Sequence, residues 1–114
     1  MKLNRKLLAV TLFPALLLGG CGASETNSPG GQTMPEGPAE TIALYKASCI
    51  SCHGTDLKGR MNAQTDIRDI GSRLTPEMIQ QQIENGGSLM PGFKHSLSEQ
   101  EIQALTDWLA GLKG

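Results

Sequence analysis

The stretch Cys49-Ile50-Ser51-Cys52-His53 decides how this sequence is interpreted. Two thiols three positions apart lie on the same side of a helical turn, and a histidine follows them directly. This spacing is the attachment signature of c-type haem, in which both sulfurs bind one edge of the porphyrin and the imidazole binds the iron. We therefore expect Cys49 and Cys52 to hold one covalent haem c, with His53 as the proximal iron ligand.

Further uses of a Cys-x-x-Cys pair have less support in this sequence. A zinc site needs a second pair of ligands, and His95 is the sole remaining partner. A thiol–disulfide redox pair is typical of a thioredoxin-like βαβ segment, which the sequence pattern lacks. A structural disulfide would also use two cysteines, and so would a copper chaperone that binds through thiols and methionines.

A methionine is the expected ligand on the other side of the iron. Met90 stands in the stretch Ser88–Phe93, where the proline and glycine that follow it stiffen and turn the chain. A thioether ligand favours ferrous iron and raises the reduction potential. Met90 could instead be a packing residue, since methionines commonly fill gaps in a core. Its rivals as ligand are Met61, Met78 and His95.

The first 20 residues have the pattern of an export signal. Three basic residues precede an apolar run over 7–18, which is too short to span a bilayer comfortably. Leu18-Gly19-Gly20-Cys21 follows and resembles a lipoprotein box, so Cys21 is the expected lipidation site. An ordinary signal peptide with an incidental cysteine is the alternative. Two acyl chains on Cys21 would anchor the protein firmly to a membrane without a transmembrane helix.

Composition divides the rest of the chain into a tether and one small domain. Residues 21–38 are rich in Gly, Ser, Pro and Thr and contain one large apolar side chain, Met34, so we expect a lipidated flexible tether. Residues 39–114 form the expected folded domain, which is near the size at which an apolar core alone is marginal. A covalently held apolar cofactor would complete that core.

Three helices are expected in this domain, and no segment alternates with the period of a strand. Thr75 and the proline that follows it mark the start of the second helix, and Asn85-Gly86-Gly87 marks its end. Ser98-Glu99-Gln100-Glu101 is a capping box for the third helix. A loop with a short helical turn is expected over 59–73. The helices are expected at about 38–51, 76–85 and 98–112.

Charge narrows the range of partners. Residues 21–114 hold seven of the ten lysines and arginines and all eleven acidic residues, so their formal charge is −4. This balance argues against a nucleic acid partner, which needs a basic face. It favours docking on a positively charged redox partner. We expect the protein to be a monomer.

Together these features resemble a class I bacterial cytochrome c, in particular the small lipid-anchored cytochromes c of Gram-positive bacteria such as bacilli. The resemblance covers the signal, the tether, the haem motif, the stretch from Asn85 to Pro91 and the last helix. It implies an all-α fold with three main helices around one covalently bound haem, and a crossing of the first and last helices near Tyr45 and Trp108. It also implies axial ligation by His53 and Met90.

One departure from the family pattern concerns the loop after the haem motif. Relatives usually carry a Gly-Pro pair there, and its proline carbonyl accepts the second N–H of the proximal histidine. No proline occurs between His53 and Pro76, so another carbonyl or Asn62 has to take this role. The sequence leaves open whether the haem propionates are met by Arg60, Arg68, Arg73 or none of these.

The resemblance implies one-electron transfer by a carrier that is not an enzyme, because an iron with six ligands has no position for a substrate. It implies a quinol–cytochrome c reductase as donor and a terminal cytochrome oxidase as acceptor, on the outer face of the cell membrane. The alternative is a haem enzyme or gas sensor with an open distal position.

Overall fold

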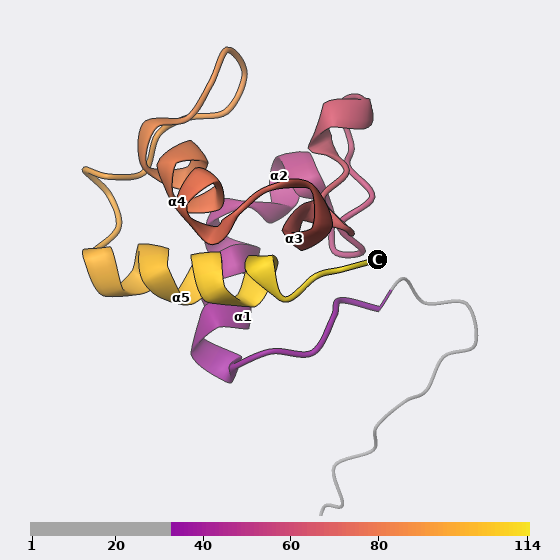
Figure 1. The fold of residues 1–114 in the computed structure, drawn as a ribbon, viewed down its shortest axis with the longest axis horizontal. Coiled ribbons are helices and arrows are strands. Elements are labelled where there is room, and N and C mark those ends of the chain that lie inside the picture. Colours follow the sequence, from indigo (N-terminus) through magenta and orange to yellow (C-terminus); the bar gives the residue numbers. More distant parts are fainter. Residues whose placement is uncertain (1–32) are drawn as a thin grey trace, which may run out of the picture.

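The computed structural model describes residues 33–114, so the expected signal segment, Cys21 and most of the expected tether lie outside the described residues. The described chain is helical and contains no strand, as expected for an all-α fold (Figure 1). No helix within 33–114 has the length and apolar character needed to span a membrane. The elements are α1 (Ala39–Ser48), α2 (Ile50–His53), η1 (Ala63–Thr65, a 3-10 turn), α3 (Ile70–Arg73), α4 (Pro76–Asn85) and α5 (Glu99–Ala110).

The first expected helix is divided in two at Cys49. There φ is −121° and ψ is −27°, so the backbone leaves the helical conformation for one residue. The N–H of Cys49 still donates to the Tyr45 carbonyl at 2.9 Å, and its own carbonyl accepts the His53 N–H at 3.1 Å. The expectation of one continuous helix over 38–51 is therefore wrong, because the backbone at Cys49 separates α1 from α2.

The start signals read from the sequence for α4 and α5 are confirmed. The Thr75 hydroxyl accepts the N–H of Met78 at 3.3 Å, with Pro76 as the first helical residue. At α5 the Ser98 hydroxyl accepts the Glu101 N–H at 3.2 Å, while the Glu101 carboxylate accepts the Ser98 N–H at 2.8 Å. These reciprocal bonds satisfy N–H groups that a helix start would otherwise leave without partners.

Helix α5 lies at the centre of the packing and contacts α1, α3 and α4. Figure 1 shows α1 crossing α5, with α3 and α4 both above α5 in this view. At the crossing, the rings of Tyr45 and Trp108 meet edge to face, with centroids 5.2 Å apart and planes at 67°. This confirms the crossing implied by the resemblance. The buried side chains of α5 are Ile102, Leu105, Thr106, Trp108 and Leu109.

The chain just before α1 is held against α5. Trp108 Nε1 donates a hydrogen bond to the Glu36 carbonyl at 3.0 Å. A Cβ on Gly37 would lie 2.5 Å from that indole nitrogen, so the backbone passes over the ring without room for a side chain. Met34 is partly buried against the core. The described part of the expected tether, residues 33–38, therefore packs on the domain.

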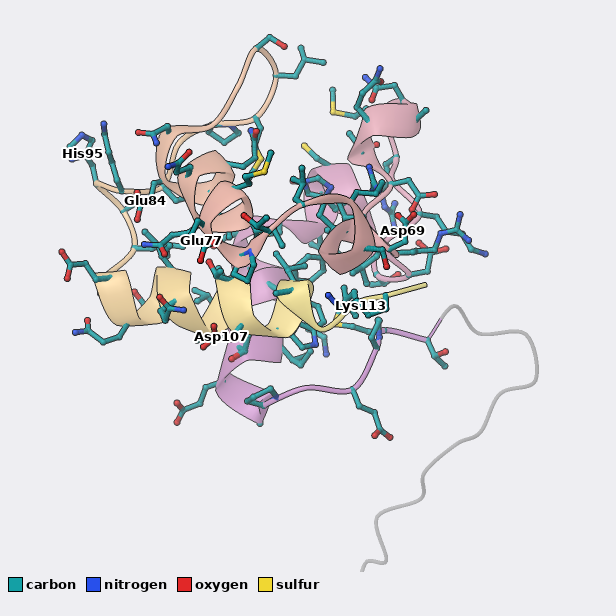
Figure 2. All side chains as sticks on the ribbon, viewed as in Figure 1. Asp69, Glu77, Glu84, His95, Asp107 and Lys113 are labelled. Atoms are coloured by element: carbon teal, nitrogen blue, oxygen red, sulfur yellow. The ribbon has the colours of Figure 1, made fainter. Side chains whose placement is uncertain are left out.

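The last residues of the chain pack on α3. The Gly71 N–H donates to the Leu112 carbonyl at 2.8 Å, and the Ser72 hydroxyl donates to the Lys113 carbonyl at 2.8 Å. A Cβ on Gly71 would overlap the Ala110 carbonyl, so only glycine allows this close approach. Figure 2 shows Lys113 beside this part of the fold. The C-terminal segment thus ties α3 to α5.

Candidate functional site

A cavity of about 690 Å³ lies between the haem motif, α3, α4 and the loop after α4. This volume is within the usual range for a site that encloses a small molecule or cofactor. Cys49, Cys52, His53 and Met90 all line it, although they come from opposite halves of the domain. The other apolar lining residues include Ile67, Ile70, Leu74, Ile79, Ile83, Phe93, Leu105 and Leu109.

His53 has one ring nitrogen engaged by the backbone. Its Nδ1 lies 2.8 Å from the carbonyl oxygen of Thr65. A carbonyl oxygen can only accept, so Nδ1 must carry the hydrogen and donate it. In the neutral ring this leaves the lone pair on Nε2, which is the form that a metal ligand needs. The acceptor that the missing proline leaves unassigned is therefore the carbonyl of Thr65.

The loop that presents Thr65 is fixed by short-range hydrogen bonds. The side chain of Asn62 accepts the Gln64 N–H at 3.1 Å, and the Thr65 hydroxyl donates to the Asn62 carbonyl at 2.6 Å. Gly59 has φ +82°, and a Cβ there would lie 2.7 Å from the Thr65 carbonyl carbon. Asn62 thus does not bind His53 itself but shapes the turn that carries the acceptor.

Tyr45 closes the buried side of the haem motif. Its side chain is fully buried, and its hydroxyl donates to the Gly54 carbonyl at 2.8 Å. Burial raises the pKa of Tyr45 far above its usual value, and the charges of Cys49 and Asp56 act in the same direction. The phenol therefore stays protonated and keeps this hydrogen bond to the residue after His53.

Met90 enters the cavity from the loop between α4 and α5. The loop is tied to the end of α4, because the Gly87 N–H donates to the Met90 carbonyl at 2.8 Å. Gly86 has φ +70°, and a Cβ there would overlap the same carbonyl. The side chain of Met90 is partly buried against the core. Asn85-Gly86-Gly87 thus ends α4 and also holds the loop that carries Met90.

The rivals of Met90 lie in different places. Met61 also lines the cavity, although it is 55% exposed. Met78 is 50% exposed on α4 and does not line the cavity. His95 is exposed, and Figure 2 shows it pointing outward from the chain before α5. One methionine besides Met90 is therefore positioned near the same space.

The Cys49 thiol does not have the environment of a reactive redox cysteine. Burial raises the pKa of the Cys49 thiol to about 11, and the neighbouring charge of Cys52 acts in the same direction. Thiols that attack disulfides usually have a lowered pKa, because the thiolate is the nucleophile. Within residues 33–114, no three His, Cys, Asp or Glu side chains gather as a metal site. The described residues thus give no support to a zinc site or to thiol exchange.

The arginines are engaged unequally around the cavity. Arg73 lines it, and its guanidinium donates to the Asp69 carboxylate at 2.8 Å and to the Asp66 carbonyl at 2.6 Å. Arg68 instead makes a two-pronged contact with the Asp66 carboxylate, at 3.0 and 2.6 Å. Arg60 does not line the cavity. Of the arginines considered from the sequence, Arg73 lines the cavity and Arg60 and Arg68 do not.

These residues fit a covalently held porphyrin. The cavity has largely apolar walls. It is lined by two thiols from one helical turn, by an imidazole whose Nε2 is unprotonated in the neutral ring, and by a thioether. Sequence reasoning did not identify Thr65 or Gln82, which contact His53 and Met90. The Asn-x-x-Thr spacing of 62–65 is a local signal for the first. Nothing local in the sequence indicates the second, because that contact forms only when α4 and the following loop pack together.

Known proteins match this chain along most of its length. A family model described as "Cytochrome C oxidase, cbb3-type, subunit III" matches residues 31–109. Cytochrome c-551 of Bacillus subtilis (strain 168) is 28% identical, with 99% of this chain and 100% of the relative covered. Cytochrome c-550 of the same organism is 24% identical, over 93% of this chain and 87% of the relative.

Two further matches agree. Cytochrome c6 of Leptolyngbya boryana is 31% identical over 54% of this chain and 76% of its own length. The solved structure of the KustC0563 c-type cytochrome is 27% identical and superposes with a TM-score of 0.57, covering 65% of this chain and 98% of that chain. The cofactor is therefore covalently bound haem c, and the protein is a c-type haem electron carrier. The chain belongs to the family matched by that model and is a class I bacterial cytochrome c that resembles those of Gram-positive bacteria.

Proposed function

We propose that this protein carries single electrons on a haem c bound through thioethers to Cys49 and Cys52, with His53 and Met90 as the axial ligands. The bound haem iron supplies the redox chemistry by alternating between the ferric and ferrous states. The observation that supports the assignment best is that these four side chains line one largely apolar cavity. With both axial positions taken, no site remains for a substrate, so we propose a carrier and not an enzyme.

The protein residues keep this site fixed while its charge changes. The Thr65 carbonyl holds the proton on Nδ1 of His53 and so keeps the ring in one tautomer and orientation. The short hydrogen bonds at the end of α4 hold the loop that carries Met90. The largely apolar walls would contact the porphyrin faces, and ligands held in place in this way would need little rearrangement when an electron is gained or lost.

Partners are proposed to dock on the face where the cavity opens. Leu89 is 65% exposed and Met61 is 55% exposed, and both line the cavity. No aspartate or glutamate of the described chain lines it. A partner would therefore meet exposed apolar side chains and no acidic side chain, with Arg73 as the one arginine or lysine of the described chain in the lining. The net negative charge of the chain would then steer the approach only weakly. Small and brief contacts of this kind are usual for electron transfer.

We further propose that a lipid on Cys21 anchors the protein on the outer face of the cell membrane. There the domain would pass electrons from a quinol–cytochrome c reductase to a terminal oxidase. Support comes from the sequence pattern of residues 1–21 and from the match to Bacillus subtilis cytochrome c-551, which extends over the N-terminal segment as well as the domain. Mass spectrometry of the N-terminal peptide tests the lipid directly, and an unmodified Cys21 would contradict it.

Exposure of the reduced holoprotein to carbon monoxide tests the carrier function. If Met90 holds the sixth position, carbon monoxide should leave the ferrous spectrum unchanged, while a chemical reductant and oxidant should cycle the protein reversibly. A rapid, stoichiometric spectral change on adding carbon monoxide would contradict the proposal. That result would favour a haem enzyme or gas sensor with an open distal position.

A further inference from the structure

The sulfur of Met90 accepts a hydrogen bond from α4. Gln82 Nε2 lies 3.7 Å from Met90 Sδ and donates to it, and Gln82 itself lines the cavity. It is the last of three consecutive glutamines, whose side chains have different surroundings. Gln80 donates to the Glu84 carboxylate at 2.7 Å, and Gln81 does not line the cavity. Of the three, only Gln82 combines an amide donor with a place at the site.

The backbone keeps Gln82 and Met90 in a fixed relationship. The loop that carries Met90 returns onto α4, because the Phe93 N–H donates to the Ile83 carbonyl at 2.9 Å. The Lys94 N–H donates to the Glu84 carbonyl at 3.2 Å. Both acceptors lie within two residues of Gln82 on the same helix. These backbone hydrogen bonds therefore fix the loop that carries the Met90 sulfur against the part of α4 that carries the Gln82 amide.

A hydrogen bond to a thioether affects its ability to bind a metal. The sulfur has two lone pairs and is a weak acceptor, so an N–H donor on one pair leaves the other pair free for a ligand bond. The donor also draws electron density away from the sulfur. Ferric iron depends more on electron donation than ferrous iron, so this contact favours the ferrous state and raises the potential.

We propose that Gln82 is a positioning residue for Met90, which directs the free lone pair of the sulfur and raises the reduction potential of the haem. The proposal rests on the proposed function, because it requires Met90 to be an axial ligand. Gln82 belongs to α4 and lies outside the haem motif. On this proposal it is the residue that tunes the ligand on the distal side of the iron.

Substitution of Gln82 in the holoprotein tests the proposal. Gln82→Leu keeps a good helix former but removes the donor. Gln81→Leu is the matched control, since it makes the same chemical change one position away and outside the cavity. Gln82→Leu should lower the midpoint potential and alter the weak far-red sulfur-to-iron band, with unchanged helicity. It should also raise the affinity of ferric protein for added imidazole by roughly two- to tenfold, the range expected for loss of one hydrogen bond.

Gln81→Leu should leave all three quantities at their wild-type values. Gln82→Asn, which keeps the amide but is one methylene shorter, should change them in the same direction as Gln82→Leu. If the potential, band and imidazole affinity of Gln82→Leu equal those of the wild type, the proposal is wrong. Met90→Ala distinguishes failure of the ligand assignment from failure of the role of Gln82 alone. A band that survives in Met90→Ala overturns the ligand assignment and with it the role of Gln82.

Discussion

The Nδ1 atom of His53 lies 2.8 Å from the carbonyl oxygen of Thr65, which is presented by a glycine-dependent turn twelve residues further along the chain. Relatives usually use a proline carbonyl for this contact, and here a turn built by Asn62 and Thr65 serves instead. The orientation of the histidine thus depends on how closely the backbone at Gly59 approaches Thr65.

Gly59→Ala is expected to disturb this contact. The residue has φ +82°, and the added Cβ would press on the Thr65 backbone, so we expect a loss of about 1–2 kcal/mol in the free energy of unfolding. A weaker bond at Nδ1 makes the imidazole less basic, so the midpoint potential should rise. Denaturant unfolding and redox titration measure both effects. Gly111→Ala, where φ is −74°, is the control and should change both less. An unchanged potential in Gly59→Ala would show that the Thr65 contact does not tune the haem.

Trp108→Phe should release the segment before α1. The substitution removes the N–H that donates to the Glu36 carbonyl but keeps an aromatic ring against Tyr45. We expect a loss of about 0.5–1.5 kcal/mol in stability and faster cleavage after Glu36 by a glutamate-specific protease. Tyr45→Phe removes a different buried hydrogen bond, to Gly54, and should leave the rate of this cleavage unchanged. Equal cleavage rates in wild type and Trp108→Phe would argue against the contact.

Electron exchange with a protein partner should depend only weakly on salt, because the cavity rim carries no acidic side chain in the described chain. We expect the second-order rate constant to change by less than about twofold when added salt shortens the Debye screening length from about 10 to 3 Å. Leu89→Glu should slow the reaction, whereas Met78→Glu, equally acidic but away from the cavity, should not. A steep fall in rate with added salt would point instead to docking through the acidic residues.

Acid should remove one contribution to stability at Asp66. Hydrogen bonds from the Arg68 side chain, and then from its backbone N–H, lower the pKa of this carboxyl to about 2 from its ordinary value of 3.8. Since folding favours the carboxylate, its contribution is complete above about pH 4 and is lost as the pH falls towards 2. The difference in melting temperature between wild type and Asp66→Asn should therefore shrink over that range. A difference that stays constant from pH 5 to pH 2 would contradict the ion pair.

Local signals in the sequence were enough to predict the all-α fold and the beginnings of α4 and α5, because caps and prolines act within a few residues. Cys49, Cys52, His53 and Met90 line one cavity. Their roles as haem attachment sites and iron ligands, inferred from the motif and from the loop with Pro91, stay predictions. The break at Cys49 was missed, because the apolar pattern of a helix continues through it.

Contacts between distant segments could not be predicted from the sequence. The packing of residues 33–38 on Trp108 is one example, because their composition is that of a flexible linker. The Thr65 acceptor and the Gln82 donor are others, since each depends on where a loop returns after a turn. Such contacts are set by tertiary packing, for which a single sequence carries little local signal.

The far-red absorption band of the oxidised protein tests the proposed ligand set most directly, with Met90→Ala and Met61→Ala measured beside the wild type. Both methionines line the cavity, so the pair distinguishes the ligand from its neighbour. The wild type and Met61→Ala should show the weak sulfur-to-iron band, and Met90→Ala should lack it and bind carbon monoxide when reduced. A band that persists in Met90→Ala, or that disappears only in Met61→Ala, would contradict ligation of the iron by His53 and Met90.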